Sequence, residues 1–427
     1  MHRRKRTHAL RAHVALAIVS LASAAAVAVA QDRGATPGAM TLKQSFAAAW
    51  ARQPEAQALQ ARRESARAAQ DSARLWTPEP VALELAHKTD RLNRNQGTRE
   101  FEFGMAVPLW LPGERARSGA LADAEASAID SRVVAAQLRL AGTLREAWWQ
   151  WQRARIDADV AGAQLANARR LAADVAKRLK AGDMARADQH QADGAVAAAE
   201  AALAQATGTS ASAELMLRAL VGPLWGAAPQ TLPPVGAEPD PADTAAVADP
   251  AAHPGVIELE RRAAVAGHAL ALASVQTRGN PELTLATTRE RGSMGESYNQ
   301  TLTLALRIPF GAGSRQVAKT ATARAEAVEL QAQLALERDR VVSEREAARL
   351  RVSSARLQLD AAQRRTQLAG ESRGFFEKSF RLGETDLPTR LRIEFEAAEA
   401  ERQLARSRIE LAAAISQWRQ ALGLLPE

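Results

Sequence analysis

Acidic residues follow two glycine turns in this sequence. Their spacing suggests a chemical role more directly than the spacing of any other residues does. Asp183 and Asp188 follow the first turn, and Glu384 and Asp386 follow the second. Rings of carboxylates around an opening favour the entry of cations. We therefore expect these four residues to form an acidic entrance ring if the chain lines a pore. The plainer alternative is that they are solvated acids at helix ends.

Other side chains give little sign of catalysis or metal binding. The chain has no cysteine, and beyond residue 30 no two histidines are paired at ligand spacing; these histidines are His87, His190, His253 and His268. The sequence contains no phosphate-binding loop, nucleophile elbow or metalloprotease motif. We expect no enzymatic activity, no cofactor and no metal site. A metal ion, if involved, would be cargo that passes through.

The composition indicates that helices position these residues. The apolar fraction is 47%, but only 4% of the 427 residues are aromatic and roughly a quarter are Ala. Ala, Leu, Arg, Gln and Glu, which fill the long stretches, are all good helix formers. We therefore expect long, closely packed helices. The densest aromatic group, Trp148, Trp149 and Trp151, is expected to pack within one of them and not to bind a ligand.

The basic excess lies partly in an N-terminal leader. Residues 1–11 contain five Lys or Arg and no acid, and an apolar run follows that ends in Ala28-Val29-Ala30. This pattern predicts a signal peptide over residues 1–30, cleaved before Gln31. Removing its five positive charges would reduce the net charge from +8 to +3. No basic patch interleaved with aromatic residues appears elsewhere, so we expect no binding to nucleic acid.

The chain beyond the leader is internally duplicated. Four landmarks recur at an offset of 201 residues, namely Pro80, Pro108, Gly182 and Gly222 as Pro281, Pro309, Gly383 and Gly423. This register predicts two structural repeats, residues 31–222 and 253–427. Residues 223–252 between them are rich in proline, with Glu238, Asp240, Asp243 and Asp249 as the only charges. We expect an irregular equatorial connector there.

Each repeat has the same predicted plan of helices. A helix-patterned stretch comes first (Leu42 to Leu75; Val256 to Thr277), and a very long one follows later (Gly113 to Lys180; Gly313 to Arg381). At 1.5 Å per residue the long helices would extend ~100 Å. Each ends near a tip, at residue 182 or 383, after which a second helix returns. That returning helix carries a heptad in the second repeat: Leu391, Phe395, Ala398, Ala405, Ile409 and Ala412.

Between these helices lie short segments that alternate apolar and polar residues. They form predicted β-hairpins at about residues 80–109 and 281–309. Runs of 8–11 residues with one apolar face are typical of tilted transmembrane strands. Trp76, Trp110 and Phe310 lie where the strands meet the helices, as expected for an aromatic belt at a membrane interface. Four strands cannot close a barrel, so several protomers would have to pool them.

The order of these features resembles the TolC-type outer-membrane efflux channels, also called outer membrane factors. The resemblance runs from Thr41 to Gly423 and rests on the starts of the repeats, the strand ends, the tips and the closing glycines. These read Thr41-Leu42 and Gln53-Pro54; Val107-Pro108-Leu109 and Ile308-Pro309-Phe310; Arg178-Leu179-Lys180-Ala181-Gly182-Asp183 and Arg381-Leu382-Gly383-Glu384-Thr385-Asp386-Leu387; and Leu220-Val221-Gly222 and Ala421-Leu422-Gly423. The overall character is most similar to the CzcC-like heavy-metal efflux branch.

The resemblance implies a mainly α protein with a small membrane β part. Three copies would form an α-helical barrel in the periplasm, capped by a twelve-stranded β-barrel with four strands per chain in outer-membrane lipid. It also implies that the tips dock onto a periplasmic adaptor linked to an inner-membrane pump of the resistance-nodulation-division type. The expected docking residues are Arg178, Leu179, Gly182, Asp183, Arg381, Leu382, Gly383, Glu384 and Thr385.

The expected function is therefore the passive exit duct of a tripartite efflux system, with heavy-metal cations as possible cargo. A channel for drug efflux or protein secretion is the first alternative. A periplasmic adaptor is a weaker one, because adaptors usually carry a single helical hairpin. An exported structural coiled-coil protein would leave the strands unexplained.

Overall fold

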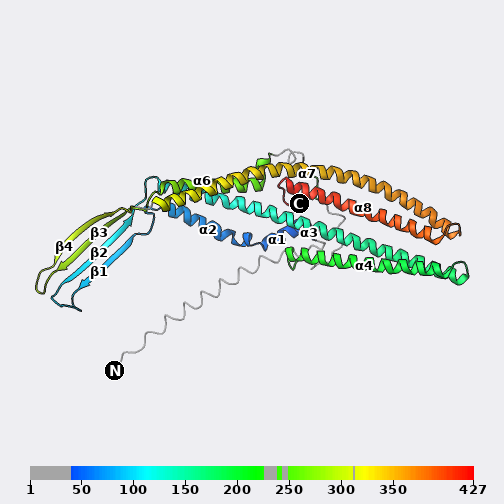
Figure 1. The fold of residues 1–427 in the computed structure, drawn as a ribbon, viewed down its shortest axis with the longest axis horizontal. Helices are drawn as coiled ribbons and strands as arrows, with labels where there is room; N and C mark the ends of the chain where they lie inside the picture. Colours follow the sequence, from blue (N-terminus) through cyan, green and yellow to red (C-terminus); the bar gives the residue numbers. More distant parts are fainter. Residues whose placement is uncertain (1–39, 226–237, 243–248, 311–312) are drawn as a thin grey trace, which may run out of the picture.

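Long helices with a small sheet at one end make up this structure, a computed structural model that describes residues 40–225, 238–242, 249–310 and 313–427. The sheet lies at one end of the elongated molecule and two helical hairpin tips lie at the other (Figure 1). The predicted signal peptide, residues 1–30, falls outside the described residues, as does much of the predicted connector. No helix among the described residues is long and apolar enough to cross a membrane.

The first half of the chain forms two short helices, a hairpin of strands and a long helical hairpin. Its elements are α1 (Leu42–Ala51), α2 (Pro54–Arg74), β1 (Ala82–Thr89), β2 (Arg99–Pro108), α3 (Glu114–Ala181) and α4 (Arg186–Val221). The helix-patterned stretch from Leu42 to Leu75 forms two helices, α1 and α2, because the chain breaks at Arg52 and Gln53. Pro54 has no N–H for a continuing helix and begins α2 at its first position.

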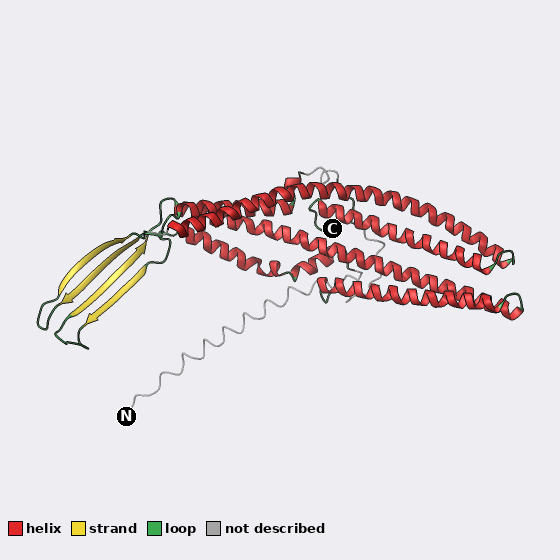
Figure 2. Ribbon diagram, in the orientation of Figure 1, coloured by secondary structure: helices red, strands yellow, loops and turns green. Residues whose placement is uncertain are grey.

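The second half repeats this order. After the 3-10 turn η1 (Pro250–Ala252) come α6 (Pro254–Val275), β3 (Glu282–Arg291), β4 (Asn299–Arg307), α7 (Gly313–Arg381) and α8 (Leu387–Ala421). The helices α3 and α7, of 68 and 69 residues, run the length of the body from the sheet to the tips (Figure 2). The shorter helices cover them in two stages: α2 and α6 lie near the sheet, and α4 and α8 near the tips (Figure 1).

All four strands join in one antiparallel sheet with the order β1-β2-β3-β4. The two hairpins were expected, but the pairing of β2 with β3, which joins the two halves of the chain, was not. The register places Leu83, Met105, Leu285 and Leu304 in one row across the sheet. The adjacent row, Glu84, Gly104, Ala286 and Thr303, belongs to the opposite face, because successive side chains alternate between the faces.

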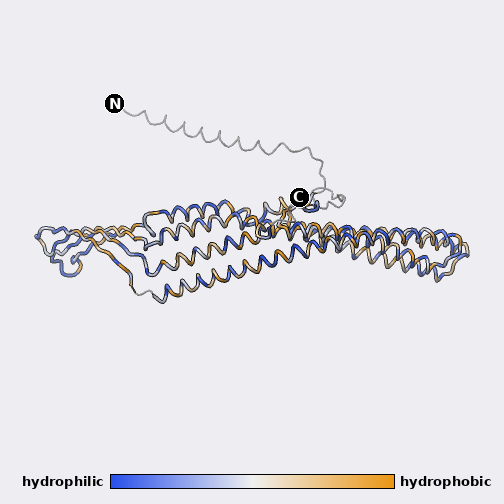
Figure 3. The backbone as a smooth tube through the Cα atoms, turned by 90° about the horizontal axis from the view of Figure 1, so that it is seen from above, coloured by the Kyte–Doolittle hydropathy of each residue, from blue (hydrophilic) through white to orange (hydrophobic). Residues whose placement is uncertain are grey.

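The sheet therefore has one apolar face and one face of small and polar residues. The apolar face remains exposed: Leu85, Leu302 and Leu304 are each at least 70% exposed. On the other face Ala106 and Ala286 are buried, and Lys88 pairs with Glu100 at 2.9 Å. Hydrophobic and hydrophilic residues are mixed along the strands, and hydrophilic loops close their far ends (Figure 3). An exposed apolar face of this length requires a partner that is not water.

The main core lies in the middle of the helical body. It gathers residues of α1, α3, α4 and α8 around three indoles, Trp148, Trp151 and Trp225, whose ring centroids are 5.1–5.7 Å apart in edge-on pairs. Trp149 is buried in the same cluster. The prediction that Trp148, Trp149 and Trp151 are packing residues is confirmed.

The heptad expected along α8 describes its buried face only in part. Ile409 and Ala412 are buried, but Phe395 is 70% exposed within the chain. Nearer the tip the helix buries another set, Leu387, Ile393, Ala397 and Ala400. Because α8 contacts both α7 and α3, a single heptad pattern cannot account for all the residues of α8 that are buried.

Candidate functional site

The two helical tips end in the same backbone motif. Gly182 has φ 85°, its N–H donates to the Leu179 carbonyl at 3.1 Å, and the Asp183 N–H donates to the Arg178 carbonyl at 2.9 Å. The second tip repeats this geometry at Gly383, with φ 80°. A residue with a side chain is strained in this left-handed conformation. No atom lies within 4 Å of a Cβ added at either glycine, so each glycine is required by the backbone and not by packing.

Each returning helix begins with a carboxylate, but the residue differs between the repeats. Asp188 accepts a hydrogen bond from the Ala185 N–H at 3.0 Å at the start of α4. Asp386 accepts one from the Thr389 N–H at 3.1 Å at the start of α8, and the bonds from Thr389 lower the pKa of Asp386. Both acids therefore hold a helix N-terminus as carboxylates.

Arg178 connects the two tips. Its guanidinium donates a hydrogen bond to the Phe380 carbonyl at 2.9 Å and lies 4.6 Å from the centroid of the Phe380 ring. Phe380 is buried with Val175 of α3, Ala192 of α4 and Leu387 of α8. The tips of the two repeats thus share one small apolar cluster, closed on one side by Arg178.

The remaining predicted docking residues are mostly at the surface. Leu382 is 75% exposed, and Asp183, Arg381, Gly383 and Glu384 are also exposed, whereas Leu179 is half-buried. The Thr385 hydroxyl is 2.5 Å from that of Ser379. The structure places the four predicted entrance acids at the tips, two on each. Asp188 and Asp386 cap helices there, while Asp183 and Glu384 make no side-chain hydrogen bond or ion pair with the described residues.

The predicted interfacial aromatic residues lie at the opposite end, where strands give way to helices. Trp76 is 89% exposed and Phe310 is 82% exposed. Trp110 is half-buried, and its indole N–H donates to the Leu75 carbonyl at 3.2 Å. Trp76 and Phe310 thus place two exposed aromatic rings where the sheet joins the helical body.

A buried ion cluster in the middle of the body was not predicted from the sequence. Glu238 receives two hydrogen bonds from Arg145, at 2.6 and 2.9 Å, and Arg419 lies 3.4 Å away. All three side chains are at most 4% exposed. Arg419 also donates to the Pro239 carbonyl at 3.1 Å. The cluster fastens residues 238–242 to α3 and α8. The available sign in the sequence was that residues 223–252 are rich in proline and carry four acids, Glu238 among them, but no Lys or Arg.

The described residues contain no group of three His, Cys, Asp or Glu that could hold a metal ion. Among the described histidines, His253 is the one that is buried and caps a helix. It is 6% exposed, and its Nδ1 accepts a hydrogen bond from the Gly255 N–H at 3.2 Å at the start of α6.

Comparison with known proteins agrees with this architecture. Residues 47–223 match the family described as outer membrane efflux protein. The sequence has no significant match among curated proteins. Among solved structures, CusC, described in connection with transmembrane channel formation, superposes with a TM-score of 0.72 at 18% identity, covering 90% of this chain and 92% of that chain.

Two further structures are similar over the same length. VceC, an outer membrane protein from Vibrio cholerae, has a TM-score of 0.71 at 17% identity, covering 90% of this chain and 97% of that chain. The Neisseria gonorrhoeae MtrE outer membrane channel, described in its open state, has a TM-score of 0.71 at 15% identity, covering 90% and 89%. The fold of this chain is therefore the fold of these channels.

Proposed function

Because residues 47–223 belong to the outer membrane efflux protein family, we propose that three copies of this chain form an efflux duct through the outer membrane. The observation that carries the proposal is the sheet with one exposed apolar face at the end of a ~100 Å helical body. An apolar sheet face is stable in lipid, while the long hairpins can cross the periplasm.

The sheet also supports the proposed number of copies. Its outer strands, β1 and β4, leave their outward edges unpaired, and each residue of both strands is exposed. Unpaired backbone groups are costly in lipid, so the edges must be closed by other chains. Pairing β4 of one copy with β1 of the next in a homotrimer gives twelve strands, enough for a closed barrel.

The helical tips are the proposed contact with a periplasmic adaptor. Exposed Leu382 offers an apolar contact beside Arg381 and Glu384, and the glycine turns hold these residues in a fixed geometry. The adaptor would connect the duct to an inner-membrane pump, of the resistance-nodulation-division type, that expels the cargo. The duct itself is passive and needs no cofactor.

Heavy-metal cations are the proposed cargo, with drugs or secreted proteins as the alternatives. Asp183 and Glu384 support passage of cations, because they are exposed at the tips and have no ionic partner among the described residues. Replacing Glu384 by Gln should reduce the preference for cations in single-channel recordings without disturbing the helix cap at Asp386. An unchanged selectivity would remove Glu384 from the entrance ring.

Membrane fractionation is the direct test of the duct. We expect a heat-modifiable trimer in the outer membrane that conducts ions in planar bilayers, and a deletion strain that becomes sensitive to the cargo in a panel of metals, drugs and secreted proteins. A soluble periplasmic monomer would contradict the proposal and would favour an adaptor or a structural coiled-coil protein.

A further inference from the structure

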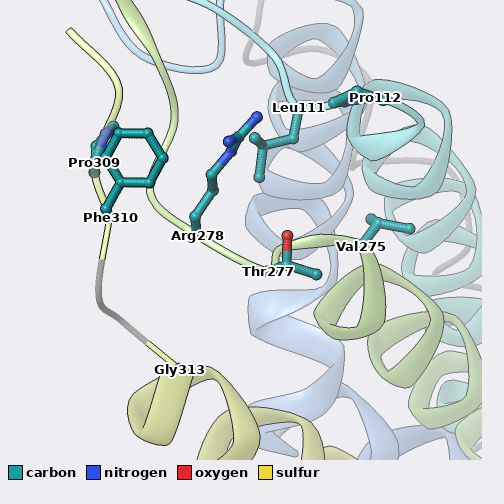
Figure 4. A pocket seen from close by; sticks show the side chains of 8 residues that line it. All are labelled: Leu111, Pro112, Val275, Thr277, Arg278, Pro309, Phe310 and Gly313. Atoms are coloured by element: carbon teal, nitrogen blue, oxygen red, sulfur yellow. The ribbon is translucent and has the colours of Figure 1, made fainter.

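A cavity of about 470 Å³ lies at the junction of the sheet and the helices. Four segments line it: Leu111 and Pro112 before α3; Val275, Thr277 and Arg278 at the end of α6; Pro309 and Phe310 after β4; and Gly313 at the start of α7. Figure 4 shows the Arg278 side chain extended between Phe310 on one side and Leu111 on the other. The cavity is thus lined by apolar side chains together with Thr277 and one cation, Arg278.

Among the described residues, Arg278 has no counter-charge. It is half-buried, yet it makes no hydrogen bond or ion pair with any described residue. None of the residues that line the cavity carries a carboxylate. The neighbouring acid, Glu114, is already engaged by the Leu111 N–H, Gln276 and Asn280 at 2.7–3.0 Å. A guanidinium removed in part from water is costly without an anion, so the site favours an anionic ligand.

The surroundings of the cavity also favour a ligand with an apolar part. Phe310 is 82% exposed beside Arg278 and follows the exposed leucines of β4, Leu302, Leu304 and Leu306. Arg278 therefore lies where the apolar face of the sheet meets the helices. In a protein whose sheet lies in lipid, this is the level of the lipid headgroups.

We propose that this cavity binds the phosphate group of a membrane phospholipid through Arg278, with the acyl chains lying along Phe310 and the β4 leucines. The inference rests on the proposed function, because it requires the sheet to lie in the outer membrane. The exposed Thr277 hydroxyl can donate a second hydrogen bond to the phosphate.

The first repeat does not offer a second such site. The residue that corresponds to Arg278 at the offset of 201 is Thr77. Arg115, the nearby cation in that repeat, already has partners within the protein. Its guanidinium donates to the Arg74 carbonyl and lies 6.0 Å from the centroid of the Trp76 ring. The proposal is therefore one phospholipid per chain, and three per trimer.

Native mass spectrometry of the purified full-length protein, reloaded with phosphatidylglycerol after delipidation, tests the site. We expect up to three retained lipids per trimer and about tenfold weaker retention in Arg278→Gln, because a charge-assisted hydrogen bond is lost. Arg278→Lys should retain an intermediate amount. The matched control is Arg324→Gln, which removes an exposed charge of α7 and should retain lipid like the wild type.

Three outcomes would overturn the proposal. One is equal lipid retention by Arg278→Gln and the wild type, and another is equal retention of uncharged diacylglycerol. Displacement of the lipid by an equal concentration of inorganic phosphate would identify a free-anion site instead. Failure of the duct proposal can be told apart from failure of the lipid-site proposal. The duct is tested by fractionation of wild-type cells, whereas the lipid site is tested by comparing purified variants.

Discussion

The Arg178 guanidinium donates to the Phe380 carbonyl oxygen at 2.9 Å and covers the Phe380 ring, 4.6 Å from its centroid. These residues end the two long helices, one in each repeat. The contact couples the α3–α4 tip to the α7–α8 tip at the end where the proposed duct would meet its adaptor. The two tips are therefore held together by the Arg178 side chain and by the apolar cluster that contains Phe380.

Removing this contact should loosen both tips. We expect Arg178→Ala to increase amide hydrogen exchange in residues 172–192 and 376–391, because the carbonyl and ring of Phe380 lose their shared partner. Arg186→Ala removes an exposed arginine of the same tip and should leave exchange there unchanged. Unaltered exchange in Arg178→Ala would show that the apolar cluster alone holds the tips together.

Gly182 should tolerate no β-branched residue. A side chain at φ 85° costs about 1–2 kcal/mol, and relief of that strain would displace the turn. We expect Gly182→Val to abolish efflux while trimers still form on gels. Gly194→Val, placed within α4 where no atom lies within 4 Å of an added Cβ, should retain efflux. Normal efflux by the Gly182 variant would count against docking at this turn.

Glu238 should contribute far more to stability than the neighbouring acid Asp240. Glu238→Gln leaves the buried Arg145 guanidinium without its carboxylate and Arg419 with only the exposed Glu427 as an ionic partner. Removing one partner of a buried ion pair typically costs about 3–5 kcal/mol. The pair of Asp240 and Arg356 is half exposed, so Asp240→Asn should cost about 1 kcal/mol or less. Thermal unfolding of both variants measures the difference, and equal unfolding temperatures would contradict this account of the cluster.

His253 should make the protein less stable in mild acid. Burial lowers its pKa below the ordinary 6.5, and the positive charges of Arg345 and Arg340 lower it further, against an opposing effect of Glu337. The unfolded chain therefore takes up a proton first as the pH falls. The stabilisation is complete above pH 6.5 and is lost progressively below it, as the pH approaches the folded-state pKa.

The corresponding measurement is the unfolding temperature across this pH range. His253→Asn keeps a side chain that can cap α6 but does not titrate there, so its unfolding temperature should fall less between neutral and mildly acidic pH. An identical pH dependence in the wild type and the variant would assign the acid sensitivity to other groups.

Adjacent residues of β4 should respond in opposite ways to the same substitution. Leu304 lies on the exposed apolar face and Thr303 on the other. A lysine on the lipid face of a membrane strand costs about 2–4 kcal/mol near the middle of the bilayer. Leu304→Lys should therefore reduce the outer-membrane trimer recovered after fractionation. Thr303→Lys should assemble and change ion selectivity, whereas equal loss of both would contradict the proposed orientation of the sheet.

Much of the fold could be predicted because its causes are local. Alternating residues indicated the strands, long runs of helix-forming residues indicated α3 and α7, and Gly182 and Gly383 marked where those helices turn back. The break before Pro54 is also local and could have been read from that proline. The candidate tip residues could be located in the same way, since glycine and the acids after it are recognisable within a few positions.

Contacts between distant residues could not be predicted in this way, because no periodicity specifies the partner of a given side chain. Arg178 and Phe380 are separated by 202 positions, and Arg145 and Glu238 by 93. The pairing of β2 with β3, the lack of a hydrogen-bond or ionic partner for Arg278 among the described residues, and the exposure of Phe395 likewise depend on how whole elements pack. The sequence by itself determined the repeated elements and their turns. The tertiary structure decided which charges are paired, which apolar faces remain uncovered and how the two repeats are joined.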